Sequence, residues 1–217
     1  MTGSVGGGWP SPNHGARRGG VQPRLIVLHY TGMPTCAEAQ ARLCDPLAEV
    51  SAHWLISEGG EVEALVAEER RAWHAGSGSW RGRDDVNSRS IGIELANPGD
   101  RPFPQAQMAA LEGLLRDILA RWHIPARGVI AHSDMAPDRK GDPGRRFDWR
   151  RLALQGLSVW PEPGEPGDFR RDLRAFGYPD VPDADLLTAF RLRFRPWGQG
   201  TLAKDDLAVA AGLARIG

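Results

Sequence analysis

The chain has 217 residues, its 27 Lys and Arg balance its 27 Asp and Glu, and 41% of its residues are hydrophobic. A net charge of zero argues against a nucleic acid or an acidic membrane as a partner held by bulk electrostatics, because proteins that bind those partners usually carry a basic excess. Length and composition predict a globular protein with one well-buried domain and a small second one.

Residues 1–23 are rich in Gly and Pro, and we expect them to form an extended arm that lies against the domain. The arm has no apolar core of the length that a secretory signal needs, and no run elsewhere is long enough to span a bilayer. The sequence therefore predicts a cytoplasmic protein without a membrane span. A periplasmic location would be expected if a native N-terminal signal had been replaced.

The first strand is predicted for "RLIVLHY", residues 24–30, a short apolar run with β-branched residues. "TCAEAQARLCDP" then predicts a short helix with Thr35 as its N-cap. "VSAHWLISEGGEVEALV" predicts a hairpin around Gly59 and Gly60. Residues 70–87 are polar and glycine-rich, and we expect them to form a long loop outside the core.

A further strand, "SIGIELA" at residues 90–96, precedes an amphipathic helix from about Pro104 to Trp122. "GVIAH", at residues 128–132, predicts the next strand, and a charged loop after it leads to a short helix that begins near Asp148. Strands that alternate with helices, together with one hairpin, predict an α/β fold with a central mixed β-sheet flanked by helices.

The composition changes abruptly at residues 161–167, a stretch rich in Pro and Gly that predicts a linker. Three short helical patterns follow in residues 168–217; they are too short to be stable alone and predict a small three-helix domain. The expected organisation is the arm of residues 1–23, an α/β domain of residues 24–160, the linker and the helical domain.

Two histidines, His29 and His132, follow predicted buried strands at their carboxyl ends, the edge where open α/β sheets usually build their sites. Asp142 comes a short loop after His132 and can turn back to the same point. Two imidazoles and one carboxylate with an open fourth position suit a catalytic Zn²⁺. The alternative is that both histidines are hydrogen-bonded or exposed residues that bind no metal.

Glu94 and Lys140 are two further candidates for catalysis. A carboxylate inside a buried strand is costly unless it is paired or lies near a cation, so Glu94 either points outward from an edge strand or acts as a general base beside the metal. Lys140, two residues before Asp142, is either a solvated loop residue or a group that stabilises a developing oxyanion.

Two histidines elsewhere are interpreted differently. His74 lies in a glycine-rich loop beside Trp73 and Trp80, a composition suited to contacts with a sugar or a peptide; packing of the tryptophans in the core is the alternative. His53 alternates with apolar residues and is interpreted as a hydrogen-bonded structural histidine.

Five sequence motifs occur in order over residues 24–152: "LIVLHYTG", "SAHWLI", "AWHAG", "NSRSIGIELAN" and "AHSDMAPDRKGDPG". Together they resemble the zinc-dependent N-acetylmuramoyl-L-alanine amidases of the amidase type 2 family, which share a fold with the peptidoglycan recognition proteins. Residues 168–217 resemble a peptidoglycan-binding three-helix module.

The resemblance implies one Zn²⁺ per chain, bound by His29, His132 and Asp142. It implies that Glu94 is the general base and that Lys140 helps to polarise the scissile carbonyl. The loop with His74, together with Asn87, is implied to border the groove for the glycan and the stem peptide.

Two other aspartates of the same loop, Asp134 and Asp138, do not match the family's "KxDPG" pattern and receive no ligand role.

The implied reaction is hydrolysis of the amide bond between N-acetylmuramic acid and L-alanine of peptidoglycan stem peptides, with peptidoglycan fragments as the partners. We expect soluble muropeptides, including the anhydro form, to be the substrates in cell-wall recycling. The alternatives are an envelope amidase acting on intact peptidoglycan, a non-catalytic peptidoglycan-binding protein and a zinc peptidase that cleaves within the peptide. The presence of all three candidate ligands favours an enzyme over a binding protein.

Overall fold

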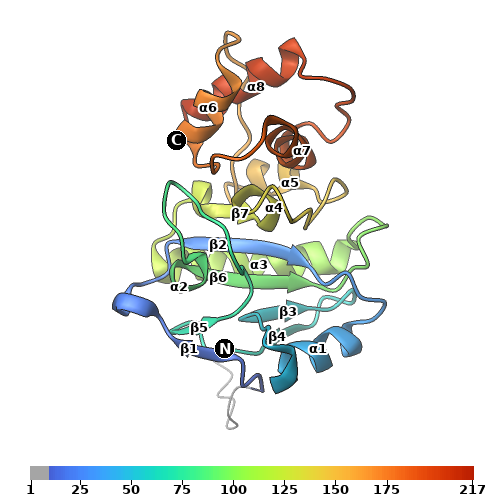
Figure 1. Cartoon of the computed structure of the whole chain (residues 1–217). Helices are drawn as coiled ribbons and strands as arrows, with labels where there is room; N and C mark the ends of the chain where they lie inside the picture. Colours follow the sequence, from blue (N-terminus) through green and yellow to red (C-terminus); the bar gives the residue numbers. More distant parts are fainter. Residues whose placement is uncertain (1–9) are drawn as a thin grey trace.

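A five-stranded mixed sheet forms the centre of the structure, a computed structural model that describes residues 10–217 (Figure 1). The strand order is β4-β3-β6-β2-β7; β3, β6, β2 and β7 are parallel, and β4 pairs antiparallel with β3. The strands are β2 Leu25–Tyr30, β3 Trp54–Ile56, β4 Val62–Ala64, β6 Ser90–Leu95 and β7 Val129–Ala131. This sheet confirms the predicted fold class, including the hairpin of β3 and β4.

Helices flank this sheet and also make up the C-terminal region. They are α1 Cys36–Cys44, α2 Val86–Arg89, α3 Gln105–Trp122, α4 His132–Met135, α5 Trp149–Leu154, α6 Phe169–Phe176, α7 Asp183–Phe194 and α8 Lys204–Ala214. Three 3₁₀ turns add to them: Arg18–Gly20, Pro46–Ala48 and Ala126–Gly128. Thr35 caps α1 by accepting a hydrogen bond from the Glu38 N–H, as the sequence predicts.

The two faces of the sheet carry different cores. On β2, Ile26 and Leu28 belong to the core that the apolar side of α3 completes. Leu25 and Val27 point to the opposite face and belong to a second core, which the C-terminal helices share. Because side chains alternate along a strand, His29 lies on the same face as Leu25 and Val27.

The N-terminal arm is integrated into the fold from residue 10 onwards, while the first nine residues of the predicted arm lie outside the described residues. β1, His14–Ala16, pairs antiparallel with β5, Arg70–Ala72. The buried guanidinium group of Arg17 then donates hydrogen bonds to several main-chain carbonyls, among them those of Ser88 and Ser90 at 2.8 and 3.0 Å. The arm therefore holds the start of β6 in place.

The prediction that residues 70–87 form a loop outside the core was wrong. β5 forms within this stretch, α2 begins in it, and Trp80 is only 1% exposed. Trp80 makes edge-to-face contacts with Phe176 and Tyr178, with ring centroids 5.6 and 5.4 Å apart. The stretch is polar by composition, but the C-terminal region covers Trp80, and local sequence cannot show that contact.

The C-terminal helices α6, α7 and α8 lie beyond the β7 edge of the sheet (orange to red in Figure 1). Phe176, Phe190 and Leu213 of these helices belong to the same continuous core as Val27 and Ile130 of the sheet. Among residues 10–217, the structure contains no helix that combines the length and the apolar character required to cross a membrane.

Candidate active site

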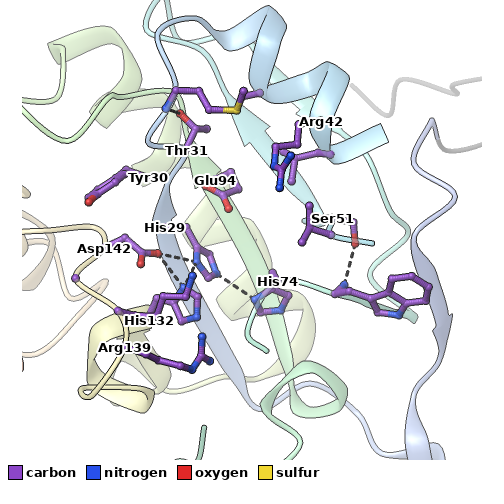
Figure 2. A pocket seen from close by; sticks show the side chains of 17 residues that line it. His29, Tyr30, Thr31, Arg42, Ser51, His74, Glu94, His132, Arg139 and Asp142 are labelled. Carbon is purple, nitrogen blue, oxygen red and sulfur yellow. Dashed lines mark hydrogen bonds and ion pairs between the residues drawn. The ribbon is translucent and has the colours of Figure 1, made fainter. Parts of the chain in front are cut away.

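A cavity of about 450 Å³ opens at the carboxyl ends of β2 and β6. Six of the seven residues singled out in the sequence line it: His29, His74, Glu94, His132, Lys140 and Asp142 (Figure 2). Asn87 is buried and does not line this cavity. The structure thus brings the candidate ligands and the two candidate catalytic residues to one place.

The sheet itself sets His29 and Glu94 side by side. They are direct partners in the parallel pairing of β2 with β6, so both side chains point to the same face, away from α3. Glu94 therefore does not point outward from an edge strand, because β6 lies between β3 and β2.

His132 follows β7 directly and is the first residue of α4 rather than the last residue of a strand. The loop after α4 returns to it, because the Ser133 N–H donates a hydrogen bond of 3.1 Å to the carbonyl of Asp142. This bond places the side chain of Asp142 beside the two imidazoles.

Three potential ligand atoms converge in the cavity. His29 Nδ1 lies 2.9 Å from His132 Nδ1 and 2.9 Å from Asp142 Oδ2, and His132 Nδ1 lies 3.0 Å from the same carboxylate oxygen. Figure 2 shows the three side chains meeting from β2, α4 and the following loop. They form a group of buried residues whose ligand atoms one metal ion can contact together.

The other nitrogen of each ligand imidazole is occupied by a hydrogen bond. His132 Nε2 lies 3.0 Å from the carbonyl oxygen of Ala75, which can only accept, so His132 donates from Nε2. In the neutral ring its Nδ1 then carries a lone pair directed at the cavity.

The tautomer of His29 follows from a chain of contacts through His74. The Ser90 hydroxyl donates to the Val86 carbonyl at 2.6 Å, so its oxygen accepts from His74 Nε2 at 3.1 Å. His74 Nδ1 is then the acceptor for His29 Nε2, also at 3.1 Å. This order leaves His29 Nδ1 without a proton as long as the ring is neutral.

Burial keeps the rings of His29 and His74 neutral near pH 7. Burial, reinforced by the nearby His132, lowers the pKa of His29 to about 4. Burial and the neighbouring imidazoles, His29 first among them, lower the pKa of His74 well below its usual value. The Nδ1 atoms of His29 and His132 and an oxygen of Asp142 therefore point at one spot, and a metal ion is the partner that satisfies all three.

The donor set fits Zn²⁺ in particular. Neutral imidazole nitrogens and one carboxylate oxygen are typical ligands of catalytic zinc, which keeps one position open for water or substrate. The hydrogen bonds at both Nε2 atoms are the outer contacts that usually orient metal-binding histidines. His29, His132 and Asp142 are thus suited to hold this ion in the way that the sequence predicts.

Asn87 and Gly92 position the loop that supplies these outer contacts. Asn87 Oδ1 accepts hydrogen bonds from the main-chain N–H groups of His74 and Ala75, at 3.0 and 2.8 Å. At Gly92, a Cβ atom would lie 2.4 Å from the His74 ring, so only glycine leaves room for that imidazole. Asn87 therefore supports the cavity wall from behind, and His74 contacts the candidate ligand His29.

Glu94 lies in the cavity with its Oε2 atom buried and without a hydrogen-bond partner among residues 10–217. Burial, and secondarily the charge of Asp142, raise the pKa of Glu94 to about 8, while the cationic Lys140 opposes this shift. A carboxyl group with a pKa near neutrality can both accept and deliver a proton, as a general acid-base catalyst must.

His53 lies outside the candidate metal site and is hydrogen-bonded on both ring nitrogens, as expected for a structural histidine. Its Nδ1 accepts a hydrogen bond from the Gly92 N–H at 2.9 Å, and its Nε2 donates to the Arg70 carbonyl at 3.1 Å. Burial, and then the charge of Arg17, lower its pKa to about 3. Its two hydrogen bonds hold β6 against the start of β5.

The sequence interpretation missed Ser90, Arg42 and Arg139. Ser90 had a detectable signal, because Ser90, Gly92 and Glu94 alternate with apolar residues and therefore share one face of β6. Arg42, from α1, and Arg139, from the loop after α4, line the cavity on different sides (Figure 2). No spacing in the sequence relates these two arginines to each other.

A sequence model of the family described as N-acetylmuramoyl-L-alanine amidase matches residues 19–145 of the chain. N-acetylmuramoyl-L-alanine amidase AmiD of Escherichia coli K12 is 35% identical, with 80% of this chain and 75% of that protein covered. The 1,6-anhydro-N-acetylmuramyl-L-alanine amidase AmpD of Enterobacter cloacae is 36% identical, with 66% of this chain and 86% of that protein covered.

Solved structures extend the similarity to the C-terminal region. The E. coli AmiD complex with the substrate anhydro-N-acetylmuramic acid-L-Ala-D-γ-Glu-L-Lys matches with a TM-score of 0.82 and 35% identity, covering 90% of this chain and 91% of that one. AmpDh3 from Pseudomonas aeruginosa, in complex with anhydromuramic pentapeptide, matches with a TM-score of 0.80 and 31% identity, covering 91% and 93%.

Proposed function

Because the chain belongs to the N-acetylmuramoyl-L-alanine amidase family and is an enzyme of that activity, we propose that its substrates are soluble muropeptides. The bond that it hydrolyses joins the lactyl group of N-acetylmuramic acid to L-alanine of the stem peptide. The observation that supports hydrolysis at this site is that the Nδ1 atoms of His29 and His132 converge with the Asp142 carboxylate. Glu94 lies beside His29 on the neighbouring strand.

His29, His132 and Asp142 would hold one Zn²⁺. When bound, this ion supplies Lewis acidity, which lowers the pKa of water and polarises a carbonyl group. The chain's own contribution is to keep the His29 imidazole neutral by burial and to fix the orientation of both imidazoles through Ala75 and His74.

Glu94 is proposed to take a proton from the attacking water and to deliver it to the leaving amine of L-alanine. Its burial without a hydrogen-bond partner supports this role, because no donor within residues 10–217 holds the buried oxygen in its ionised form. Lys140 lines the same cavity, and its ammonium group is proposed to stabilise the negative charge that develops on the scissile carbonyl oxygen.

Arg42 and Arg139 supply positive charge at the walls of the cavity. Carboxylates pair well with guanidinium groups, and a stem peptide carries several of them. The ligands in the similar AmiD and AmpDh3 structures are single anhydromuramyl peptides. These findings support soluble fragments over intact peptidoglycan as the substrates. The proposed role is cell-wall recycling, with the cytoplasm as the proposed location.

The test compares soluble anhydromuropeptides with intact sacculi and identifies the products by mass spectrometry. An amidase releases peptides that start with L-alanine and leaves a sugar without peptide, whereas cleavage within the peptide would show a peptidase. Release from sacculi alone would overturn the proposed substrate class, and recovery from the periplasm after cell fractionation would overturn the cytoplasmic location.

Metal dependence is tested with two variants of the same loop. Asp142→Asn should lose bound zinc and activity, whereas Asp138→Asn, whose side chain is exposed, should keep both. Equal zinc content in the two variants would refute the ligand assignment.

A further inference from the structure

A buried ion pair connects the C-terminal helices to the helix that carries His132. Asp134 of α4 is 0% exposed, and Arg193 of α7 is 1% exposed. The Arg193 guanidinium donates to Asp134 Oδ2, and the Tyr178 hydroxyl donates to Asp134 Oδ1. The Ala131 N–H completes the set at 2.9 Å from Oδ2, so the carboxylate receives three donors without water.

Arg193 reaches further into the α/β region. It donates to the Val129 carbonyl at 3.1 Å and to the Ser158 hydroxyl at 3.2 Å. Its guanidinium carbon lies 4.1 Å from the ring centroid of Trp149 in α5. One side chain of α7 therefore ties together β7, α4 and α5.

The α4 helix depends on such contacts because it is a single turn of four residues. A single turn is not stable without tertiary contacts. His132 lies two residues before Asp134, and the Ser133 N–H holds the Asp142 carbonyl at 3.1 Å. The orientation of α4 thus sets the positions of two of the three candidate metal ligands.

The C-terminal region also contacts the loop behind the other side of the site. Trp80 packs against Phe176 and Tyr178, and the Arg81 N–H donates to the Gly177 carbonyl at 2.9 Å. Five residues before Trp80, the carbonyl of Ala75 is the acceptor for His132. The C-terminal helices therefore contact both α4, which carries His132, and the loop whose Ala75 carbonyl accepts a hydrogen bond from His132.

We propose that the C-terminal helices are a positioning element of the metal site and that Arg193 and Tyr178 act on zinc binding through Asp134. The inference rests on the proposed zinc function. Arg193 and Tyr178 are positioning residues, because they touch neither the ligand atoms nor the cavity.

The test compares Tyr178→Phe and Arg193→Met with Asp206→Asn in the full-length chain. Asp206 is also 0% exposed and is paired with Arg191 and Arg195, but this cluster lies within the C-terminal region, and among residues 10–217 Asp206 makes no hydrogen bond to α4. The control thus weakens a comparable buried ion pair of the same helices without touching Asp134.

Zinc affinity is measured by competition with a chelator, and site geometry by the visible absorption of the Co²⁺-substituted protein. Loss of an outer contact of a metal site typically costs about 10- to 100-fold in affinity. We expect about tenfold weaker zinc binding in Tyr178→Phe and a larger loss in Arg193→Met, each with an altered Co²⁺ spectrum. Asp206→Asn should lower the melting temperature but leave both readouts unchanged.

The inference is overturned if Tyr178→Phe and Arg193→Met bind zinc as tightly as Asp206→Asn, or if all three variants lose affinity in proportion to their melting temperatures. If Arg193→Met does not fold, Tyr178→Phe decides the question, since it removes a single hydroxyl group. A wild-type chain that binds no zinc would instead refute the proposed function, so the two failures are distinguishable.

Discussion

Replacing Glu94 by Gln should change how the stability of the metal-free protein depends on pH. The pKa of Glu94 is raised from 4.5 to about 8, first by burial and then by the charge of Asp142. Between these two values the carboxyl group keeps its proton in the folded chain and loses it in the unfolded chain. The free energy of unfolding therefore falls as the pH rises from about 4.5 to about 8.

The size of this effect follows from the shift. One pKa unit corresponds to about 1.4 kcal/mol, so the whole shift sets an upper value of about 5 kcal/mol at pH 8. Oε2 of Glu94 is buried, but the residue is partly exposed to the cavity. Screening by solvent reduces the effect, and we expect about 2–3 kcal/mol. Gln has the same shape without the charge, so it removes the penalty.

The assay is urea unfolding of both proteins after chelation of metal. At pH 5 their free energies of unfolding should differ by less than about 1 kcal/mol from this cause, and at pH 8 Glu94→Gln should be more stable by about 2–3 kcal/mol. His29, His53 and His74 also titrate, but both proteins contain them, so the difference reports on Glu94. A difference that does not grow from pH 5 to pH 8 would refute the argument that burial raises this pKa.

Three further substitutions test the site. Glu94→Ala should keep its zinc but lower turnover by about two orders of magnitude or more, and undiminished turnover at normal zinc content would contradict the general-base role. Ser90→Ala removes the acceptor of His74 Nε2 and should weaken zinc binding about tenfold in a chelator competition; Ser88→Ala, which loses hydrogen bonds with the Arg18 N–H and the Asp85 carboxylate but none with His74, is its control. Gly92→Ala places a methyl group against the His74 ring and should cost about 1–3 kcal/mol in urea unfolding, so an unchanged midpoint would contradict the close packing.

The strands, the long helix and the converging ligands could be predicted because each has a local signal. "RLIVLHY" and "GVIAH" are apolar runs that end in or next to histidine, and parallel strands bring their carboxyl ends to one edge of the sheet. The register that pairs His29 with Glu94 has no such signal, since it depends on how β2 and β6 align. The even spacing of Ser90, Gly92 and Glu94 predicts only that they share a face.

What could not be predicted depends on contacts between distant parts of the chain. Residues 70–87 look like an exposed loop because most of them are polar, yet Trp80 is buried by aromatic residues almost a hundred positions later. Arg17 looks like an ordinary residue of a flexible arm, but it is buried among main-chain carbonyls near the start of β6. Trp80 and Arg17 both lie in polar stretches, and each is buried by residues that are distant in the sequence.

The three aspartates of the segment after β7, which comprises α4 and the following loop, show why residue type alone does not identify a metal ligand. Asp138 is exposed, and Asp134 is buried but receives hydrogen bonds from Ala131, Tyr178 and Arg193. Asp142 is buried too, yet its Oδ2 faces two imidazole nitrogens whose protons are directed elsewhere. A carboxylate whose hydrogen-bond donors are all present needs no metal ion, whereas one that faces lone pairs does. All three are close together in the sequence. Only the direction of the surrounding N–H and O–H groups distinguishes Asp142, the proposed ligand, from Asp134, which has a structural role.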